Sequence, residues 1–135
     1  MDKIDIIMVE DDQMVGEIAR DILTEKGYAV RLVNESREAL AAIRECMPKL
    51  VITDIMMPGI TGMDICKSVK IDPALKHIKV MIMSAKSFET ERRRAAMMGA
   101  SHFLVKPFTV PGLLAAVNGL IGEPGEEPPP PPTAS

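Results

Sequence analysis

The sequence predicts a single α/β domain in which five parallel strands alternate with five helices. Short apolar runs, rich in Val, Ile, Leu and Met, alternate along the chain with longer segments of helical periodicity. The apolar runs lack the polar alternation of half-exposed strands, which is typical of strands buried on both faces of a sheet. A chain of 135 residues is long enough for one substantial core but not for two.

Five short apolar segments are expected to form the strands. In chain order they are residues 4–9, 29–33, 50–53, 80–83 and 102–105. Each is followed by a segment with the spacing of a helix, so that successive strands are joined by helical crossovers. The pattern is therefore (βα)₅.

End signals delimit the first two helices. Gly27 can close the first helix as a left-handed C-terminal cap. Ser36 is expected to cap a second helix that runs through Ile43, and Pro48 prevents much continuation beyond it. The apolar positions that define the first helix recur at helical spacing: Met14, Val15, Ile18, Ala19, Ile22 and Leu23.

The other three helices follow the third, fourth and fifth strands. Thr61 and Asp64 form a capping arrangement for the third helix. The fourth is expected over residues 87–98 and is closed by Gly99. Thr109 can cap the fifth, in which Pro111 falls within the first turn.

The composition changes at Gly122. The last 14 residues are dominated by Gly, Glu and Pro and include five consecutive prolines at 128–132. Such a segment cannot bury enough apolar surface to fold, so we expect it to be polyproline II or disordered. The folded domain is thus expected over residues 1–121 and a Pro-rich disordered tail over 122–135. We interpret the tail as a linker or spacer, with a ligand for a proline-binding module as the alternative.

Charge and composition argue against several classes of function. A net charge of −3 gives no overall attraction for nucleic-acid phosphates or anionic membranes, so we expect neither direct nucleic-acid binding nor membrane insertion. The apolar stretch near Met1 is too short and too acidic for a signal peptide, which favours a cytoplasmic location. Cys46 and Cys66 lack the spacing of a zinc site or a disulfide framework.

Polar residues gather where the predicted strands end. In an open parallel sheet the functional crevice lies at the carboxyl ends of the strands, so these residues are expected to converge. Three carboxylates, a hydroxyl and an ammonium group would then meet at this edge of the sheet. The residues are Glu10, Asp11 and Asp12 after the first strand, Asp54 after the third, Ser84, Ala85 and Lys86 after the fourth, and Lys106 and Pro107 after the fifth.

This set of side chains favours magnesium and phosphate chemistry. Clustered carboxylates repel one another unless one is protonated or a divalent cation binds. Ligands that are all oxygens favour Mg²⁺, which accepts one or two carboxylates together with waters and phosphate oxygens. Lys106 adds a compact positive charge and Ser84 a hydroxyl donor. The arrangement suits phosphoryl transfer to a carboxylate.

Each residue also has an ordinary structural explanation when it is taken alone. An acidic trio after a strand most often caps the next helix. Asp54 could cap a loop, Ser84 could occupy a turn, and Lys106 could lie on the surface. These explanations do not account for all four groups at one edge of the sheet in this order.

Four segments together resemble the receiver domain of bacterial two-component response regulators, over residues 3–121. They are IIMVEDD, VITDIMMPGITGMD, VMIMSAKS and GASHFLVKPF. One segment alone is a weak match, but four in order at matching spacing are specific. The resemblance implies a flavodoxin-like three-layer sandwich with strand order 2-1-3-4-5.

The resemblance implies a role for each acidic residue. Asp54 stands at the position of the phosphoacceptor. Glu10, Asp11 and Asp54 stand at the positions of the Mg²⁺ pocket, with Asp11 as a direct ligand and Glu10 acting through water. Met56 is implied to contribute its backbone carbonyl to the same ion.

It also implies roles for the remaining residues. Lys106 stands at the position of the phosphate-contacting lysine, and its bond to Pro107 is expected to be cis. Ser84 and Phe103 stand at the positions of the conformational switch, and the small Ala85 leaves the pocket open. Phe103 lacks the hydroxyl of the commoner tyrosine, so any hydrogen bond to a partner through that group is absent.

The implied function is signal relay. A sensor histidine kinase or phosphotransfer protein would donate a phosphoryl group to Asp54, and a downstream effector would recognise the face formed by the fourth helix, fifth strand and fifth helix. The domain would not be a metabolic enzyme, although hydrolysis of its own acyl phosphate is an expected accompanying activity. The run at residues 92–94 is either a solvated basic face or part of a partner surface.

Three alternative functions fit the sequence less well. A phosphatase that forms an aspartyl phosphate usually has a second Asp two residues after the nucleophile, where this chain has Met56. A flavodoxin-like cofactor module needs a phosphate-binding loop after the first strand, where this chain is acidic. A degenerate receiver that signals without phosphate would be expected to lack some of the chemical positions, all of which are filled here.

Overall fold

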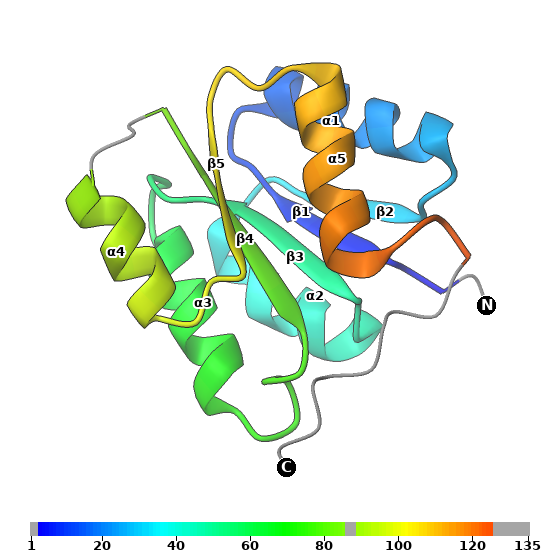
Figure 1. Cartoon of the computed structure of the whole chain (residues 1–135). Coiled ribbons are helices and arrows are strands. Elements are labelled where there is room, and N and C mark those ends of the chain that lie inside the picture. Colours follow the sequence, from blue (N-terminus) through cyan, green and yellow to red (C-terminus); the bar gives the residue numbers. More distant parts are fainter. Residues whose placement is uncertain (1–2, 86–88, 126–135) are drawn as a thin grey trace, which may run out of the picture.

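The computed structural model describes residues 3–85 and 89–125, which form a five-stranded parallel sheet between two layers of helices (Figure 1). The strand order is β2-β1-β3-β4-β5, so the predicted flavodoxin-like topology is confirmed. The strands are β1 (Ile6–Val9), β2 (Val30–Val33), β3 (Leu50–Asp54), β4 (Lys79–Ser84) and β5 (His102–Val105). The helices are α1 (Gln13–Lys26), α2 (Ala39–Cys46), α3 (Gly62–Ile71), α4 (Glu89–Met97) and α5 (Val110–Ile121).

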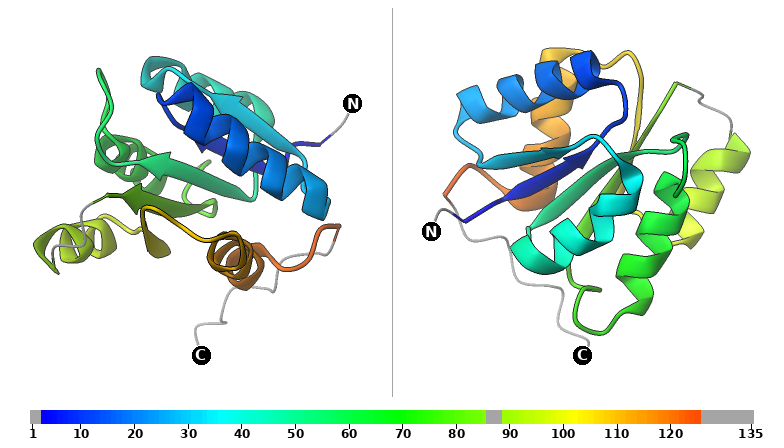
Figure 2. Two further views of the ribbon diagram at one scale, coloured as in Figure 1. Left: turned by 90° about the horizontal axis from the view of Figure 1, so that it is seen from above. Right: turned by 180° about the vertical axis from the view of Figure 1, so that it is seen from behind.

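Both faces of the sheet are covered by helices. Helices α1 and α5 cover one face, and α2, α3 and α4 cover the other (Figure 2). Alternate residues of β1 belong to different cores: Ile6 packs with the α1 and α5 side, and Ile7 with the α2 to α4 side. Burial on both faces explains why the strands are continuous apolar runs in the sequence.

The topology reverses direction between β1 and β3. The chain passes from β1 outward to β2 and then returns to form β3 on the other side of β1. Connections leave the carboxyl ends of β1 and β3 in opposite directions, and the crevice that results is where doubly wound sheets bind ligands. The parallel register pairs Val9 with Thr53, which brings the segments after these two strands to one edge.

Most of the predicted helix ends are confirmed. Gly27 has φ 120° and its N–H bonds to the carbonyls of Leu23 and Thr24. Thr61 accepts from the N–H of Asp64, whose side chain accepts from the backbone of Thr61, so the capping box is complete. The Thr109 side chain accepts from Gly112, and Pro111 lies in the first turn of α5. Helix α4 begins at Glu89, and residues 87 and 88 of the expected helix lie outside the described residues.

The prediction that Ser36 caps the second helix is wrong. Ser36 opens a 3₁₀ turn (Ser36–Glu38) that precedes α2. The N-cap of α2 is Glu38, which makes no side-chain cap hydrogen bond. The buried Ser36 hydroxyl instead donates to the Pro58 carbonyl (2.7 Å) and accepts from the Ile60 N–H (3.0 Å). Ser36 therefore holds the loop that follows β3. Helix α2 also continues to Cys46, beyond the predicted Ile43.

The apolar periodicity of α1 locates the helix but only part of its apolar face is buried. Ala19 and Leu23 are fully buried against the sheet. Met14 is 72% exposed and Ile18 is 51% exposed. The apolar side chains of α1 therefore divide between the core and the surface.

Contacts of the described chain continue past Ile121. The buried Tyr28 hydroxyl donates to the Gly122 carbonyl at 2.6 Å. The Oε2 atom of Glu123 lies 3.8 Å from Nζ of Lys26, which is the last residue of α1. Among the described helices, none has the length and apolar character to cross a membrane.

Candidate functional site

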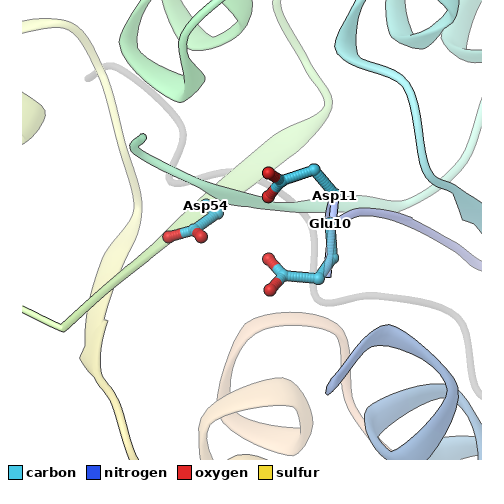
Figure 3. Close-up of side chains that lie close together, drawn as sticks. All are labelled: Glu10, Asp11 and Asp54. Carbon is cyan, nitrogen blue, oxygen red and sulfur yellow. The ribbon is translucent and has the colours of Figure 1, made fainter. Parts of the chain in front are cut away.

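Three carboxylates meet at the carboxyl edge of the sheet. Glu10 and Asp11 follow β1, and Asp54 is the last residue of β3. One carboxylate oxygen from each lies within 4.8 Å of the others. Figure 3 shows the three side chains close together at this edge, with Glu10 and Asp11 extending toward Asp54. Glu10 is buried, Asp11 is exposed and Asp54 lies between these extremes. The convergence predicted from the strand ends is confirmed for these residues.

Lys106 bridges two of these carboxylates. Its Nζ donates to Glu10 Oε1 at 2.9 Å and to Asp54 Oδ2 at 3.1 Å. Its backbone N–H donates to the Ser84 carbonyl at 2.7 Å, which fixes the loop after β5 to the end of β4. The Lys106–Pro107 peptide is cis, as expected. The ammonium group thus lies directly beside the proposed acceptor.

The backbone around Asp54 fixes the orientation of its carboxylate. The Ile55 N–H donates to Asp54 Oδ1 at 3.0 Å, which leaves Oδ2 for Lys106. Helix α3 begins close behind, and the Gly62 N–H bonds to the Ile55 carbonyl at 2.9 Å. A Cβ at Gly62 would lie 2.0 Å from the Asp54 carbonyl oxygen. Only glycine allows this approach of α3 to the end of β3.

Burial controls the protonation of the site. Burial raises the pKa of Glu10 to about 7, and the nearby Asp54 carboxylate adds to this effect, while Lys106 opposes it. Burial alone would lower the pKa of Lys106, but its hydrogen bonds to Glu10 and Asp54 outweigh burial and raise it. The lysine therefore remains a cation at neutral pH.

The cluster has the donors that a hard divalent cation requires. Glu10 Oε2 is buried and has no hydrogen-bond partner among the described residues. Buried polar atoms of this kind normally have a partner, an ordered water or an ion. Three oxygen donors with an open side toward Asp11 fit Mg²⁺, which keeps several waters and uses few carboxylates. Met56 has an exposed side chain in the next loop, and the role of its carbonyl as a ligand stays a prediction.

The two expected switch residues lie on neighbouring strands. Ser84 is 4% exposed and pairs with Val105 across β4 and β5. Phe103 is 9% exposed and packs in the core that α4 covers, so its ring faces the interior. The guanidinium of Arg92 lies 5.2 Å from the centre of this ring, over its face. Lys86, named with the strand-end residues, lies outside the described residues.

An apolar surface beside the acidic site was not predicted from the sequence. A hollow of about 410 Å³ is lined by Val15 and Ile18 of α1, by Ala85, and by Lys106, Pro107 and Phe108. The exposed Met14 lies on the same helix. The apolar positions of the first helix were visible in the sequence. Their periodicity does not show which of them the sheet buries and which stay exposed.

The sheet topology and this lysine-bridged acidic cluster define a class of protein, a flavodoxin-like α/β domain with a carboxylate site at its switch point. The family described as response regulator receiver domain matches residues 6–118. The chain belongs to this family, whose members are domains of two-component signal transduction.

Several relatives share most of this chain. The phosphate regulon transcriptional regulatory protein PhoB of Rhizobium meliloti is 31% identical over 116 residues, which are 86% of this chain and 51% of PhoB. The polar-differentiation response regulator DivK of Brucella anthropi is 28% identical over 87% of this chain and 96% of DivK. This chain spans about half the length of PhoB and of regulators similar to it.

Solved structures agree with the fold. A response regulator receiver domain protein from Clostridium thermocellum has a TM-score of 0.80 at 28% identity, over 87% of this chain and 94% of that chain. The chemotaxis protein CheY4 of Vibrio cholerae, at 24% identity, has a TM-score of 0.82 over 88% of this chain and 99% of that one. The second likeness supports the fold alone.

Proposed function

We propose that this domain receives a phosphoryl group on Asp54 from a sensor histidine kinase or phosphotransfer protein, and that a downstream effector reads the phosphorylated state. The observation that carries the proposal is the Lys106 ammonium, bound to both Glu10 and Asp54 beside an unsatisfied Glu10 oxygen. The Asp54 carboxylate beside a fixed cation has the charges that phosphoryl transfer needs.

In the proposed reaction, an oxygen of the Asp54 carboxylate attacks the phosphorus of a phosphohistidine. The P–O bond forms as the P–N bond breaks, and the electron pair of the broken bond returns to the imidazole nitrogen of the donor. The Ile55 N–H holds the carboxylate, and Lys106 contacts the incoming phosphoryl oxygens.

Mg²⁺, when bound, supplies positive charge that stabilises the phosphoryl oxygens during transfer. Glu10, Asp11, Asp54 and the carbonyl of Met56 are the proposed groups that hold it. Glu10 and Asp11 come from the loop after β1, so this loop and the end of β3 must keep their relative positions for the site to form.

The apolar surface on α1 supports docking of the phosphodonor. Val15, Ile18 and Phe108 line a hollow that includes Lys106, so a partner seated there would place its histidine next to Asp54. Histidine donors carried on helical proteins could bury apolar side chains on this surface. Exposed apolar residues rimmed by polar groups commonly mark such interaction sites.

The output is proposed to run through Ser84 and Phe103. The Ser84 hydroxyl would contact a phosphoryl oxygen, and the shift of the β4 end would reach Phe103 on β5 and Arg92 on α4. The effector is proposed to bind the α4, β5 and α5 face. Loss of the Arg92 contact would alter this face without touching the acceptor.

The test uses acetyl phosphate and Mg²⁺ with the whole chain. We expect intact mass spectrometry to show one phosphoryl group that is labile to base, and we expect Asp54→Asn to remain unmodified because its side chain is not an anionic nucleophile. Asp21→Asn, on the exposed surface of α1, is the matched control and should be modified normally.

Two outcomes would contradict the proposal. Modification of Asp54→Asn at the parent level would place the acceptor elsewhere. No modification of the parent by acetyl phosphate or by a phosphorylated histidine donor would favour a domain that signals without phosphate. Rapid hydrolysis of a generic phosphate ester would instead indicate a phosphatase.

A further inference from the structure

A second hollow lies between α3 and α4, where Figures 1 and 2 show the two helices side by side. It measures about 830 Å³ and opens to solvent. Lys67, Lys70 and Ile71 of α3 line one wall, and Thr90, Arg93, Arg94 and Met97 of α4 line the other. We call it the α3–α4 groove. It shares no lining residue with the acidic site or with the apolar surface of α1.

Large apolar side chains are exposed on both walls of the groove. Met97 is 87% exposed, the highest value for a large apolar residue in the described chain, and Ile71 is 71% exposed. Met98 is partly buried and connects this surface to the core below. Exposed apolar side chains gathered in a concave surface are typical of a binding site for another protein.

The charges that line the groove are all positive. Among the described lining residues there is no carboxylate. Lys67 and Arg94 form no ion pair within the described residues, and Arg93 makes only an exposed contact with Glu89, at 3.4 Å. Such exposed pairs contribute little and exchange easily for a new partner. The whole chain has a net charge of −3, so this basic groove is a local feature.

Lys70 has a structural role in the groove. Its Nζ donates to the carbonyls of Ile78 (2.6 Å) and Lys76 (3.1 Å), and burial lowers its pKa. Its stem packs against Gly99, which has φ 95°, at the end of α4. Lys70 therefore joins the ends of α3 and α4 and keeps the groove in shape, while Lys67, Arg93 and Arg94 remain available to a partner.

We propose that the α3–α4 groove binds an acidic amphipathic helix of a partner protein. Its apolar side chains would cover Ile71 and Met97, and its Asp or Glu residues would pair with Lys67, Arg93 and Arg94. The nine residues of α4 form a wall about 14 Å long at 1.5 Å per residue, which a partner helix of about three turns would cover. We choose an acidic partner because its negative charges complement the positive charges that line the groove.

Other occupants fit less well. A second copy bound through the same groove would place two sets of cations face to face, because a two-fold interface is self-complementary. Nucleic acid would contact the cations but would leave Ile71 and Met97 uncovered, and the lining residues include no aromatic side chain for a base to stack on. Binding to the groove is tested on the unphosphorylated chain, so either proposal can fail without the other.

The test is a titration of the unphosphorylated whole chain with a designed helical peptide. The peptide has leucines at i, i+3, i+7 and i+10, with glutamates on both flanks of the leucine stripe. We expect NMR shift changes centred on Arg94 and Met97. Lys67→Glu and Arg94→Glu should each raise the Kd about fivefold, since reversal of an exposed charge replaces a weak attraction by a similar repulsion.

Matched controls separate the groove from net charge. Lys3→Glu reverses an exposed lysine outside the groove and should leave the Kd unchanged. Met97→Gln should weaken binding but keep its dependence on salt, because it removes apolar contact and no charge. A peptide with lysines in place of the glutamates should not bind.

The proposal is overturned if Lys3→Glu weakens binding as much as Lys67→Glu, or if the lysine peptide binds equally well. It is also overturned if a DNA duplex or vesicles containing phosphatidylserine bind these residues more tightly than the acidic peptide does. Self-association that Lys67→Glu strengthens would assign the groove to a second copy of the chain.

Discussion

Glu10 is a carboxylate that the fold keeps almost completely out of water. One of its oxygens binds Lys106, and the other has no partner among the described residues. Burial raises the pKa of Glu10 from 4.5 to about 7, so the folded domain binds a proton at pH values where the unfolded chain has released it. A divalent cation would replace that proton and satisfy the free oxygen.

This pKa shift predicts a pH dependence of stability in the metal-free domain. Between pH 4.5 and about 7 the folded state holds the proton and the unfolded state does not, so the free energy of unfolding falls as pH rises through this window. Well above pH 7 Glu10 is ionised in both states, and the loss of stability caused by its burial is then complete. We expect Glu10→Gln to match the parent near pH 4.5 and to be more stable by about 3 kcal/mol at pH 8.

Urea unfolding in the presence of a chelator measures this difference, at several pH values from 4.5 to 8. A constant difference between parent and variant across that range would contradict a raised pKa. If Mg²⁺ replaces the proton, its addition at pH 8 should stabilise the parent more than the variant.

At the scale of the elements, the position of α3 depends on its first residue. Gly62 brings the helix against the Asp54 carbonyl, where an added Cβ would meet the backbone oxygen at 2.0 Å. The Thr61 capping box fixes the same end of the helix, so α3 cannot shift without loss of its cap. Asp54 and the helix behind it are therefore one packed unit.

We predict that Gly62→Ala lowers the free energy of unfolding by about 3 kcal/mol, because the methyl group overpacks a contact between backbones. Gly119→Ala is the control: nothing lies within 4 Å of a Cβ on this residue of α5, so it should gain up to about 1 kcal/mol of helix propensity. Chemical denaturation of both variants decides this. Equal stability of the two would show that α3 can move away from β3.

Local signals in the sequence predicted the elements well. Thr61 and Thr109 find their hydrogen-bond partners three residues along the chain, so the capping pattern is visible without the fold. The partners of Ser36 lie 22 and 24 residues away, in a loop whose position depends on the sheet. The residues around Ser36 do not reveal these distant partners, so its position before a helical segment resembled that of a helix cap. The exposed Ile18 was likewise unpredictable, because exposure depends on which elements cover α1.

At the scale of the whole molecule, strand order turns distant residues into one site. Glu10, Asp54 and Lys106 follow different strands, and parallel register brings them together. Knowledge of parallel sheets was sufficient to predict the acidic cluster. The bridging geometry of Lys106, the unpaired oxygen of Glu10 and the α3–α4 groove required the packed structure, because each depends on side chains from several elements.

The end of the folded domain also depends on contacts over a long distance. The Tyr28 hydroxyl donates to Gly122, 94 residues away, and Lys79 Nζ donates to the Leu120 carbonyl at 2.7 Å, near the end of α5. Composition suggested a boundary at Ile121, but a composition change cannot show where the last hydrogen bonds lie. Contacts to the domain reach Gly122 and Glu123, and the boundary at Ile121 stays a prediction.

Two truncations test this boundary. A chain that ends after Gly125 should keep its free energy of unfolding within about 0.5 kcal/mol of the full chain, because residues 126–135 offer Pro, Glu and small side chains with little apolar surface to pack. A chain that ends after Ile121 should lose about 1–3 kcal/mol, since the buried Tyr28 hydroxyl loses its acceptor. Tyr28→Phe should then cost less in the shorter chain than in the full one, and this difference measures the hydrogen bond itself. Equal stability of all three lengths would support the boundary at Ile121, whereas a large loss in the chain ending at Gly125 would show that the last ten residues pack on the domain.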